Sequence, residues 1–186
     1  WSVESGKEAG NFFGYKFLGI YEYDESNAYS DDYSTRLTPV FQKDAQGNII
    51  IEKNMKPILI GYTNPDGSHY TGTVRQMATA GVISRGGDVI LENRPDARGV
   101  YDGNIGNEDR QFLGHGQPRW SLGWSNYITY KGFTVSFNIY GNFGGKVYNE
   151  NRRNLASFSN TNTTPDAYFI YNMWKYPGQI TDAYRG

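Results

Sequence analysis

Residues 120–140 carry the most regular alternation of apolar and polar side chains in the chain. One run leads to a short turn at Tyr130-Lys131-Gly132, and a second run follows it. A period of two predicts β-strands, so we expect an antiparallel hairpin. The first run places Trp120, Leu122, Trp124, Ile128 and Tyr130 on one face, and the second run places Phe133, Val135, Phe137 and Ile139 on one face.

The length of these two runs is as informative as their period. Strands in globular proteins usually have about 5–6 residues, whereas a strand that crosses a bilayer needs about 9–11. Long alternating strands with aromatic ends and a tight turn are typical of an outer-membrane barrel hairpin. The alternative is a long hairpin in a soluble β-sandwich, with its apolar face in the core.

The remaining pattern also predicts β-structure joined by long polar loops. Residues 11–23 form a first strand candidate with apolar side chains on both faces, and a short strand is expected at 88–91. A small hairpin is expected around Asp44–Asn48, and Asn64-Pro-Asp-Gly67 is a strong turn signal. The polar segments 24–38, 92–110 and 149–165 are expected to be loops, and a helical turn near Arg152–Phe158 is an alternative within the last of them. No internal repeat or linker divides residues 1–186, so we expect no domain boundary.

Composition narrows the choice of function. The chain has 186 residues and a net charge of −1, which gives no reason to expect a nucleic-acid partner. It has no Cys and two His, which excludes disulfides and thiolate or histidine-rich metal sites. The 16 Tyr and 23 Gly suit β-structure with many turns, and Tyr suits a membrane–water boundary. A soluble carbohydrate-binding β-domain could share this composition.

The acidic, glycine-rich stretch 102–109 is the best candidate for a ligand site. It places several oxygen-bearing side chains close together in a segment that glycines allow to bend. Calcium binds six to eight such oxygens, and Asp102, Asn104 and Asp109 are the side-chain ligands we favour. The stretch lacks the closing glutamate of an EF-hand. The alternative is a solvated loop whose Asp and Asn side chains bond to their own backbone.

Other polar residues give no support for catalysis. Neighbouring carboxylates such as Asp31 and Asp32 are expected to be surface charge, and His115 lacks a nucleophile-elbow context. We therefore do not expect an enzyme. Tyr21, Tyr23, Tyr29 and Tyr33 could stack on sugar rings, but packing within the protein is the favoured interpretation.

Three stretches, in order, resemble the barrel region of SusC/RagA-type TonB-dependent outer-membrane receptors. The first is 6–21, GKEAGNFFGYKFLGIY, and the second joins Gly87-Asp88-Val89 to the segment 102–110, DGNIGNEDR. The third is the most specific: it includes 113–120, LGHGQPRW, then 130–133, YKGF, and 141–149, GNFGGKVYN. The segment 174–182 is weakly similar to a family loop with the pattern Trp-x-x-Pro-Gly-x-x-Thr-Asp.

The resemblance implies an all-β fold, with antiparallel strands forming part of a large transmembrane barrel that has long extracellular loops. Family members import glycans or peptides across the outer membrane of Gram-negative bacteria. They act with a SusD-like surface lipoprotein and with TonB. This chain would be a partial barrel section without the N-terminal plug, the TonB-contacting segment or the last strands. Both of its ends are expected to be cut points within a longer protein.

The resemblance also implies an environment for each face of the hairpin. Phe133, Val135, Phe137 and Ile139 would face lipid, while Thr134, Ser136 and Asn138 would face the lumen. One departure from the family pattern affects the predicted calcium site. An insertion at 93–101 displaces two of the acidic positions of the family's loop. The residues that bind the cargo cannot be assigned from the resemblance.

Overall fold

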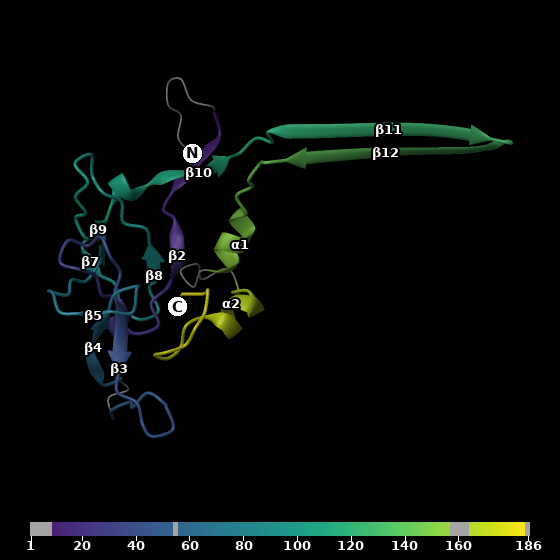
Figure 1. Cartoon of the computed structure of the whole chain (residues 1–186). Helices are drawn as coiled ribbons and strands as arrows, with labels where there is room; N and C mark the ends of the chain where they lie inside the picture. Colours follow the sequence, from purple (N-terminus) through teal and green to yellow (C-terminus); the bar gives the residue numbers. More distant parts are fainter. Residues whose placement is uncertain (1–8, 54–55, 157–163, 185–186) are drawn as a thin grey trace. The chain divides into compact units, whose positions relative to one another are not determined.

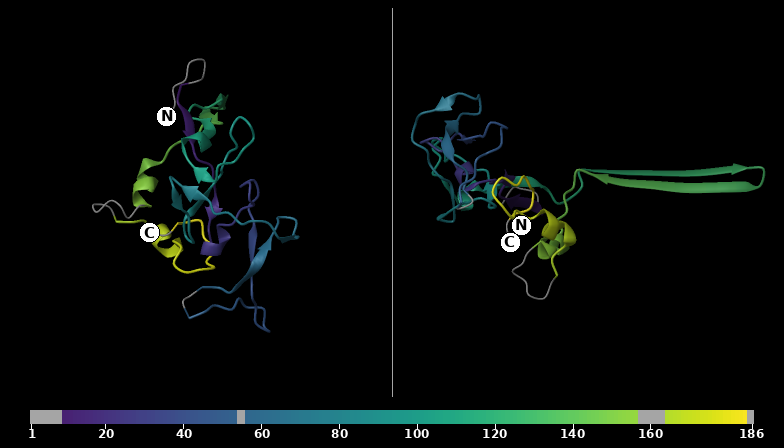
Figure 2. Two further views of the ribbon diagram at one scale, coloured as in Figure 1. Left: turned by 90° about the vertical axis from the view of Figure 1, so that its left-hand side faces the viewer. Right: turned by 90° about the horizontal axis from the view of Figure 1, so that it is seen from below.

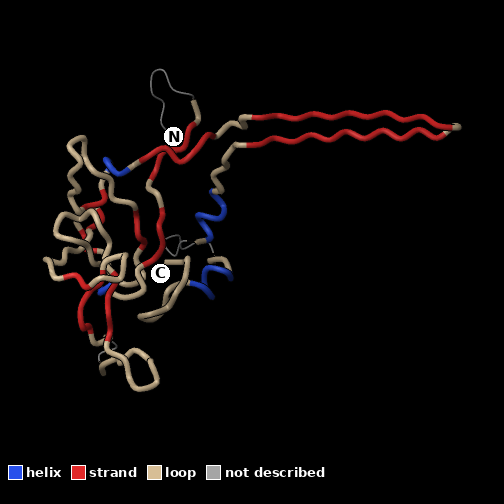
Figure 3. The backbone as a smooth tube through the Cα atoms, in the orientation of Figure 1, coloured by secondary structure: helices blue, strands red, loops and turns tan. Residues whose placement is uncertain are grey.

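The structure is a computed structural model that describes residues 9–53, 56–156 and 164–184. Strands are its main regular elements, and the helices are few and short (Figure 3). This agrees with the predicted all-β class. Residues 6–8 of the first resembling segment and 157–163 of the predicted loop 149–165 lie outside the described residues.

The described residues form two compact units, each made of segments that are distant in sequence. The first, here called the hairpin unit, comprises residues 9–14 and 111–149. The second, here called the loop unit, comprises the described residues within 15–110 and 150–184. The prediction of one barrel section without a domain boundary remains a prediction.

The hairpin unit contains two antiparallel strand pairs. Strand β1 (Asn11–Gly14) pairs with β10 (Gln111–His115), and β11 (Trp120–Tyr130) pairs with β12 (Phe133–Phe143). The second pair forms the long ribbon in Figures 1 and 2. Its two-residue turn has Lys131 at φ 45° and Gly132 at φ 87°. Two positive φ angles define a type I′ turn, whose twist matches that of a hairpin and which favours glycine. The predicted hairpin is therefore confirmed.

The loop unit contains three small sheets. In the first, β2 (Phe17–Ile20) pairs with β8 (Val89–Leu91). In the second, β4 (Leu59–Thr63) lies between β3 (Thr38–Phe41) and β5 (His69–Tyr70). In the third, β6 (Ala78–Thr79) lies between β7 (Val82–Ile83) and β9 (Asn104–Ile105). The 3-10 helices are η1 (Asp24–Ser26) and η2 (Asn107–Asp109), and the α-helices are α1 (Glu150–Leu155) and α2 (Ala167–Asn172).

The core of the loop unit is built largely from loop residues. Tyr29, Met77 and Ile105 form a buried cluster. Asn27 is also buried, and its side chain bonds to backbone groups of two other segments. Its amide nitrogen donates to the carbonyls of Met77 (2.9 Å) and Ser84 (2.7 Å). Its side-chain oxygen accepts from the Met77 N–H at 2.8 Å. Buried polar groups of this kind must be bonded, so Asn27 links segments that share no continuous strand pairing.

Several local predictions are confirmed. The turn expected around Asp44–Asn48 is closed by a hydrogen bond from the Asp44 N–H to the Asn48 carbonyl at 2.9 Å, and its flanks pair at Lys43 and Ile49. The turn at 64–67 joins β4 to β5, with Gly67 at φ 85°. The short strand expected at 88–91 is β8.

Two expectations were wrong. The strand expected at 11–23 is divided into β1 and β2, which pair with two different partners. The expected loop 92–110 contains β9, which pairs with β6 in parallel, so the strands are not all antiparallel. The segment 24–38 is a loop apart from η1 and the first residue of β3, although Asn27, Ala28 and Leu37 are buried in it. The segment 149–165 contains α1, close to the helical turn considered near 152–158.

No closed barrel is seen among the described residues, whose sheets have two or three strands each. None of the helices in this part of the chain has the length and apolar character needed to span a bilayer.

Candidate functional sites

The apolar residues of β11 and β12 lie on one shared face. In the register, Trp124 is opposite Ile139, Ile128 is opposite Val135, and Tyr130 is opposite Phe133. Directly opposed residues point to the same side of a sheet, so the two apolar sets predicted from the sequence form one continuous surface. Asn126 is the polar interruption on this face, where it lies opposite Phe137.

This apolar face is exposed instead of covered by a core. The exposed fraction is 78% for Phe133, 57% for Val135 and 49% for Ile139. Phe137 is half-buried and makes an edge-on ring contact with Trp124 at 5.3 Å. A contiguous apolar surface of this kind marks a contact with lipid or protein.

The opposite face of the hairpin is polar. It pairs Ser121 with Asn142 and Thr129 with Thr134, and the side chains of both pairs are hydrogen-bonded, at 2.8 Å and 3.3 Å. Tyr127 also lies on this face, opposite Ser136. The side chains predicted to face the lumen therefore lie on the face away from Phe133–Ile139.

The length of the hairpin matches the height of the apolar band on a barrel. Each strand has 11 residues. At about 3.4 Å per residue the ribbon spans roughly 37 Å. A tilt of about 45° reduces its height to roughly 26 Å, close to the apolar band of about 25 Å on outer-membrane barrels.

The three residues of the predicted calcium site already have backbone partners. The Asp102 carboxylate accepts from the Asn104 N–H at 3.0 Å, and the Asn104 side-chain oxygen accepts from the Gly81 N–H at 2.8 Å. Asp109 is fully buried, and its two oxygens accept from the N–H groups of Arg94 (2.6 Å) and Gly106 (2.8 Å).

This geometry favours the alternative in which the acidic side chains fix their own loop. Among the described residues, no group of three His, Cys, Asp or Glu side chains is suited to hold a metal ion. A carboxylate oxygen retains a second lone-pair site after accepting one hydrogen bond. Calcium at Asp102, Asn104 and Asp109 therefore remains a prediction, to be tested by experiment.

The insertion at 93–101 forms an Asp-centred turn of its own. The Asp96 carboxylate accepts from the backbone N–H groups of Val100 (3.0 Å) and Arg98 (2.8 Å), and it also pairs with the Arg98 guanidinium at 2.8 Å. The Val100 backbone hydrogen bond, followed by the Arg98 side chain, lowers the pKa of Asp96 from its ordinary value of 3.8. The insertion is therefore a locally ordered loop.

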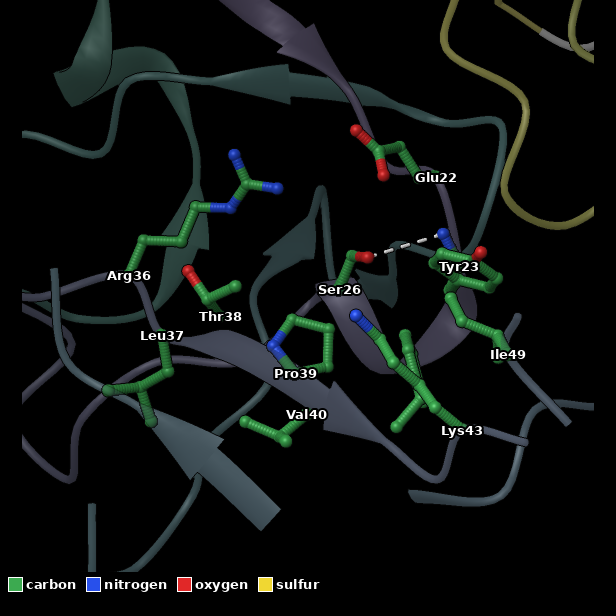
Figure 4. A pocket seen from close by; sticks show the side chains of 11 residues that line it. Glu22, Tyr23, Ser26, Arg36, Leu37, Thr38, Pro39, Val40, Lys43 and Ile49 are labelled. Atoms are coloured by element: carbon green, nitrogen blue, oxygen red, sulfur yellow. Dashed lines mark hydrogen bonds between the residues drawn. The ribbon is translucent and has the colours of Figure 1, made fainter. Parts of the chain in front are cut away.

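A pocket of about 510 Å³ lies in the loop unit between the end of β2, η1 and β3. Figure 4 shows Glu22 and Arg36 on opposite sides of it, with their charged groups turned toward each other. Lys43 adds a second cation, and the ring of Tyr23 packs against Phe41 at 4.7 Å. Among the described residues, no ion pair is formed by Glu22, Arg36 or Lys43. The Arg36 guanidinium also lies over the Tyr21 ring, 5.4 Å from its centroid.

This pocket was not found from the sequence. Its charged residues come from three separate segments, at Glu22, Arg36 and Lys43, and they are brought together by the burial of Leu37 and by the pairing of β3. No spacing in the sequence signals such a grouping. The feature of the sequence that lies nearest to this pocket is the tyrosine-rich run 21–33.

Packing was the favoured role of that tyrosine run, and this is confirmed for two of its members. Tyr21 is 1% exposed and Tyr29 is 7% exposed, and their hydroxyl groups are hydrogen-bonded to each other at 3.1 Å. Burial is the main reason that the pKa of Tyr21 is raised above 10.0. Both rings therefore stabilise the core of the loop unit and are not free to stack on a ligand.

Comparison with known proteins supports the recognition made from the sequence. The TonB-dependent receptor P39 of Formosa agariphila is 35% identical to this chain over 179 residues. The match covers 96% of this chain but 16% of that receptor, so the chain spans about one sixth of the length of its relative. No family model and no solved structure matches the chain. This similarity identifies the chain as the counterpart of one fragment of a TonB-dependent receptor.

Proposed function

We propose that this chain is a membrane-spanning section of the β-barrel of a TonB-dependent transporter in the outer membrane of a Gram-negative bacterium, without catalytic activity. The observation that carries the proposal is the hairpin β11–β12, whose 11-residue strands separate an exposed apolar face from a polar face. Such strands suit a wall between lipid and a wet lumen.

The strand edges of the hairpin support the same proposal. Among the described residues, β11 and β12 pair with each other and with no further strand. Eleven residues of unpaired backbone on each side would be an aggregation hazard in water. They are what a barrel needs for pairing with further strands. The alternative, a soluble extracellular carbohydrate-binding domain, requires the apolar face to lie in a core, whereas Phe133 and Val135 are exposed.

The finer assignment rests on the motifs in the sequence. The ordered segments 113–120, 130–133 and 141–149 support a SusC/RagA-type receptor. The receptor would then import glycans or peptides, with a SusD-like surface lipoprotein as its partner outside and TonB as its partner inside. The TonB contact would be made by parts of the receptor other than this section.

The pocket at Glu22, Arg36 and Lys43 is our candidate for a cargo contact in this section. Its volume of about 510 Å³ lies within the range of about 300–1,000 Å³ typical of ligand sites. Its cations could donate to sugar hydroxyls or peptide carbonyls, and Glu22 could accept from a cargo hydroxyl or amide. Hydrogen bonds with one charged partner are stronger than neutral ones, which would give an open pocket useful affinity.

The proposal is tested by placing one charge on either face of the hairpin in the full-length receptor. Arginine on a lipid face near the bilayer midplane costs about 2–4 kcal/mol, and less toward the interfaces. Phe137→Arg, close to the middle of β12, should therefore reduce the amount of folded receptor in the outer membrane, measured by heat-modifiable migration in gels. The neighbouring variant Ser136→Arg is the matched control and should assemble normally. Equal assembly of the two variants would refute the face assignment.

A further inference from the structure

In the described part of the hairpin unit, every charged residue is a cation. Residues 111–149 contain no Asp or Glu, and neither do residues 9–14, the other described part of the unit. The cations are Arg119, Lys131 and Lys146. Lys131 lies in the turn between β11 and β12, while Arg119 and Lys146 lie at the opposite end, just outside the two strands.

The two cations at this open end converge on the same strand, β10. An Nη2 proton of Arg119 is donated to Nε2 of the His115 ring, and the Lys146 ammonium donates to the Leu113 carbonyl. The backbone N–H of Lys146 also donates to the His115 carbonyl at 2.8 Å. Arg119 and Lys146 are therefore both held at the Leu113–His115 end of β10. We call the group His115, Arg119 and Lys146 the basic cluster.

The local backbone is shaped to hold this cluster. Gly114 has φ 145°, and a Cβ atom there would lie 2.7 Å from Cδ of Lys146. The Lys146 chain therefore passes over a position that only glycine can occupy. The other ring nitrogen of His115 lies 3.1 Å from the Asn11 side-chain oxygen. Because that oxygen accepts the Nδ1 proton, Nε2 is left to accept from Arg119.

The cluster keeps unused hydrogen-bond donors. The guanidinium of Arg119 has five N–H donors and the ammonium of Lys146 has three, and the bonds described above use a minority of them. The described part of the unit contains no carboxylate that could pair with either charge. Phosphate is a strong partner for such a pair, because Arg and Lys bind its oxygens by charge-assisted hydrogen bonds.

The position of the cluster identifies the source of the phosphate. Arg119 directly precedes Trp120, and Lys146 follows Phe143 by three residues, so the cluster begins where the apolar face ends. Trp120 and Phe143 oppose each other and are 74% and 57% exposed, as expected at the headgroup level. Short turns of outer-membrane barrels lie on the periplasmic side. The turn at Lys131-Gly132 therefore places the cluster at the outer surface.

We propose that the basic cluster binds the phosphate of an anionic lipid headgroup in the outer leaflet. This inference rests on the proposed function, because it requires the hairpin to span the outer membrane. Arg119 and Lys146 would bind the phosphate oxygens, His115 would position Arg119, and the acyl chains would continue along the apolar face from Trp120.

The test uses the full-length receptor in nanodiscs of phosphatidylcholine mixed with bisphosphorylated lipid A, with lipid retention measured by native mass spectrometry. A basic residue near an anionic surface contributes about a fivefold effect, so the double variant Arg119→Gln/Lys146→Gln should lower lipid A retention roughly 25-fold. The matched control Lys131→Gln, which removes the charge at the other end, should leave it unchanged. Dephosphorylated lipid A should be retained no better than phosphatidylcholine.

Each alternative outcome has a distinct meaning. Unchanged retention in the double variant, or an equal loss in Lys131→Gln, would overturn the inference while leaving the proposed function intact. Displacement of lipid A by inorganic phosphate at equal concentration would also overturn it, because the cluster would then bind phosphate and not a lipid. A wild-type receptor that does not assemble in the outer membrane would overturn both proposals.

Discussion

The hairpin unit and the loop unit use aromatic side chains in opposite ways. In the hairpin unit Trp120, Tyr130 and Phe133 are exposed by 67–78%, whereas in the loop unit Tyr21 and Tyr29 are buried. The hairpin β11–β12 alternates apolar and polar positions, with exceptions such as Asn126 and Tyr127, and has no buried apolar residue, while the loop unit has little regular structure and a defined core. Regular secondary structure is therefore no measure of burial here. The difference fits our proposal that the hairpin lies in an apolar surrounding, whereas the loop unit has a core of its own.

The largest contrast should appear when a large apolar residue is shortened in each unit. Leu37 is 1% exposed, so Leu37→Ala should destabilise the loop unit by about 2–5 kcal/mol. Ile128 is 52% exposed, so Ile128→Ala should leave the loop unit unaffected. The measurement is hydrogen exchange of the full-length receptor, with peptides from residues 24–42 as the reporter. A similar loss of protection in the two variants would contradict the contrast.

Removal of the pocket cations should have the next largest effect. It should weaken cargo binding and leave folding unchanged. A hydrogen bond with a charged donor is worth about 1.5–3 kcal/mol, so Arg36→Ala and Lys43→Ala should each lower cargo affinity about tenfold or more. The readout is isothermal titration of the receptor with its transported glycan or peptide. Lys56→Ala is a charge-matched control, since Lys56 does not line this pocket. Unchanged affinity in both pocket variants would exclude the pocket as a cargo contact.

The calcium prediction separates two roles for the acidic segment 102–109. If calcium binds Asp102, Asn104 and Asp109, adding Ca²⁺ after chelation should increase hydrogen-exchange protection of this segment, and Asp102→Asn should remove the increase. Peptides from β11 and β12 should not respond. If protection is the same with and without Ca²⁺, the carboxylates serve only as acceptors for the backbone, as their hydrogen bonds already suggest.

Acid should produce the smallest effect, again confined to the loop unit. Ser68 holds the pKa of Asp66 below 3.8, and the backbone N–H of Asn48 does the same for Asp44. A lowered folded-state pKa adds stability above the unfolded pKa, and this stability is lost as the pH falls through the folded value. The turns at 44–48 and 64–68 should therefore lose exchange protection below about pH 4. Asp66→Asn should remove this pH response at its own turn, while the turn at Lys131-Gly132 should show none.

The parts of the fold that could be predicted from the sequence are those determined by residues close together along the chain. The hairpin follows from alternation and from a turn that requires positive φ at Lys131 and Gly132. The pairings of β1 with β10 and β2 with β8 join residues 69 or more positions apart, and no local pattern specifies them. The burial of Asn27 was likewise hidden, because a polar residue is buried only where distant segments supply its partners.

The candidate sites likewise differ in whether residues close together in the sequence define them. The faces of Phe133–Ile139 were assigned from a repeating pattern, and the register aligns them with the apolar residues of β11. The pocket at Glu22, Arg36 and Lys43 depends on three segments meeting, so spacing could not predict it. The side chains proposed as calcium ligands lie in an oxygen-rich stretch of the sequence, but the sequence does not show that backbone N–H groups already bond to them.

The central claim is that successive residues of β12 face lipid and lumen in turn. The chain contains no cysteine, so single variants from Phe133→Cys to Tyr140→Cys can be spin-labelled in the assembled receptor without background from this section. The account predicts that labels at 133, 135, 137 and 139 are accessible to oxygen in the bilayer, and that labels at 134, 136 and 138 are accessible to a water-soluble nickel chelate. Accessibility without a period of two, or nickel access at 135, 137 and 139, would contradict it.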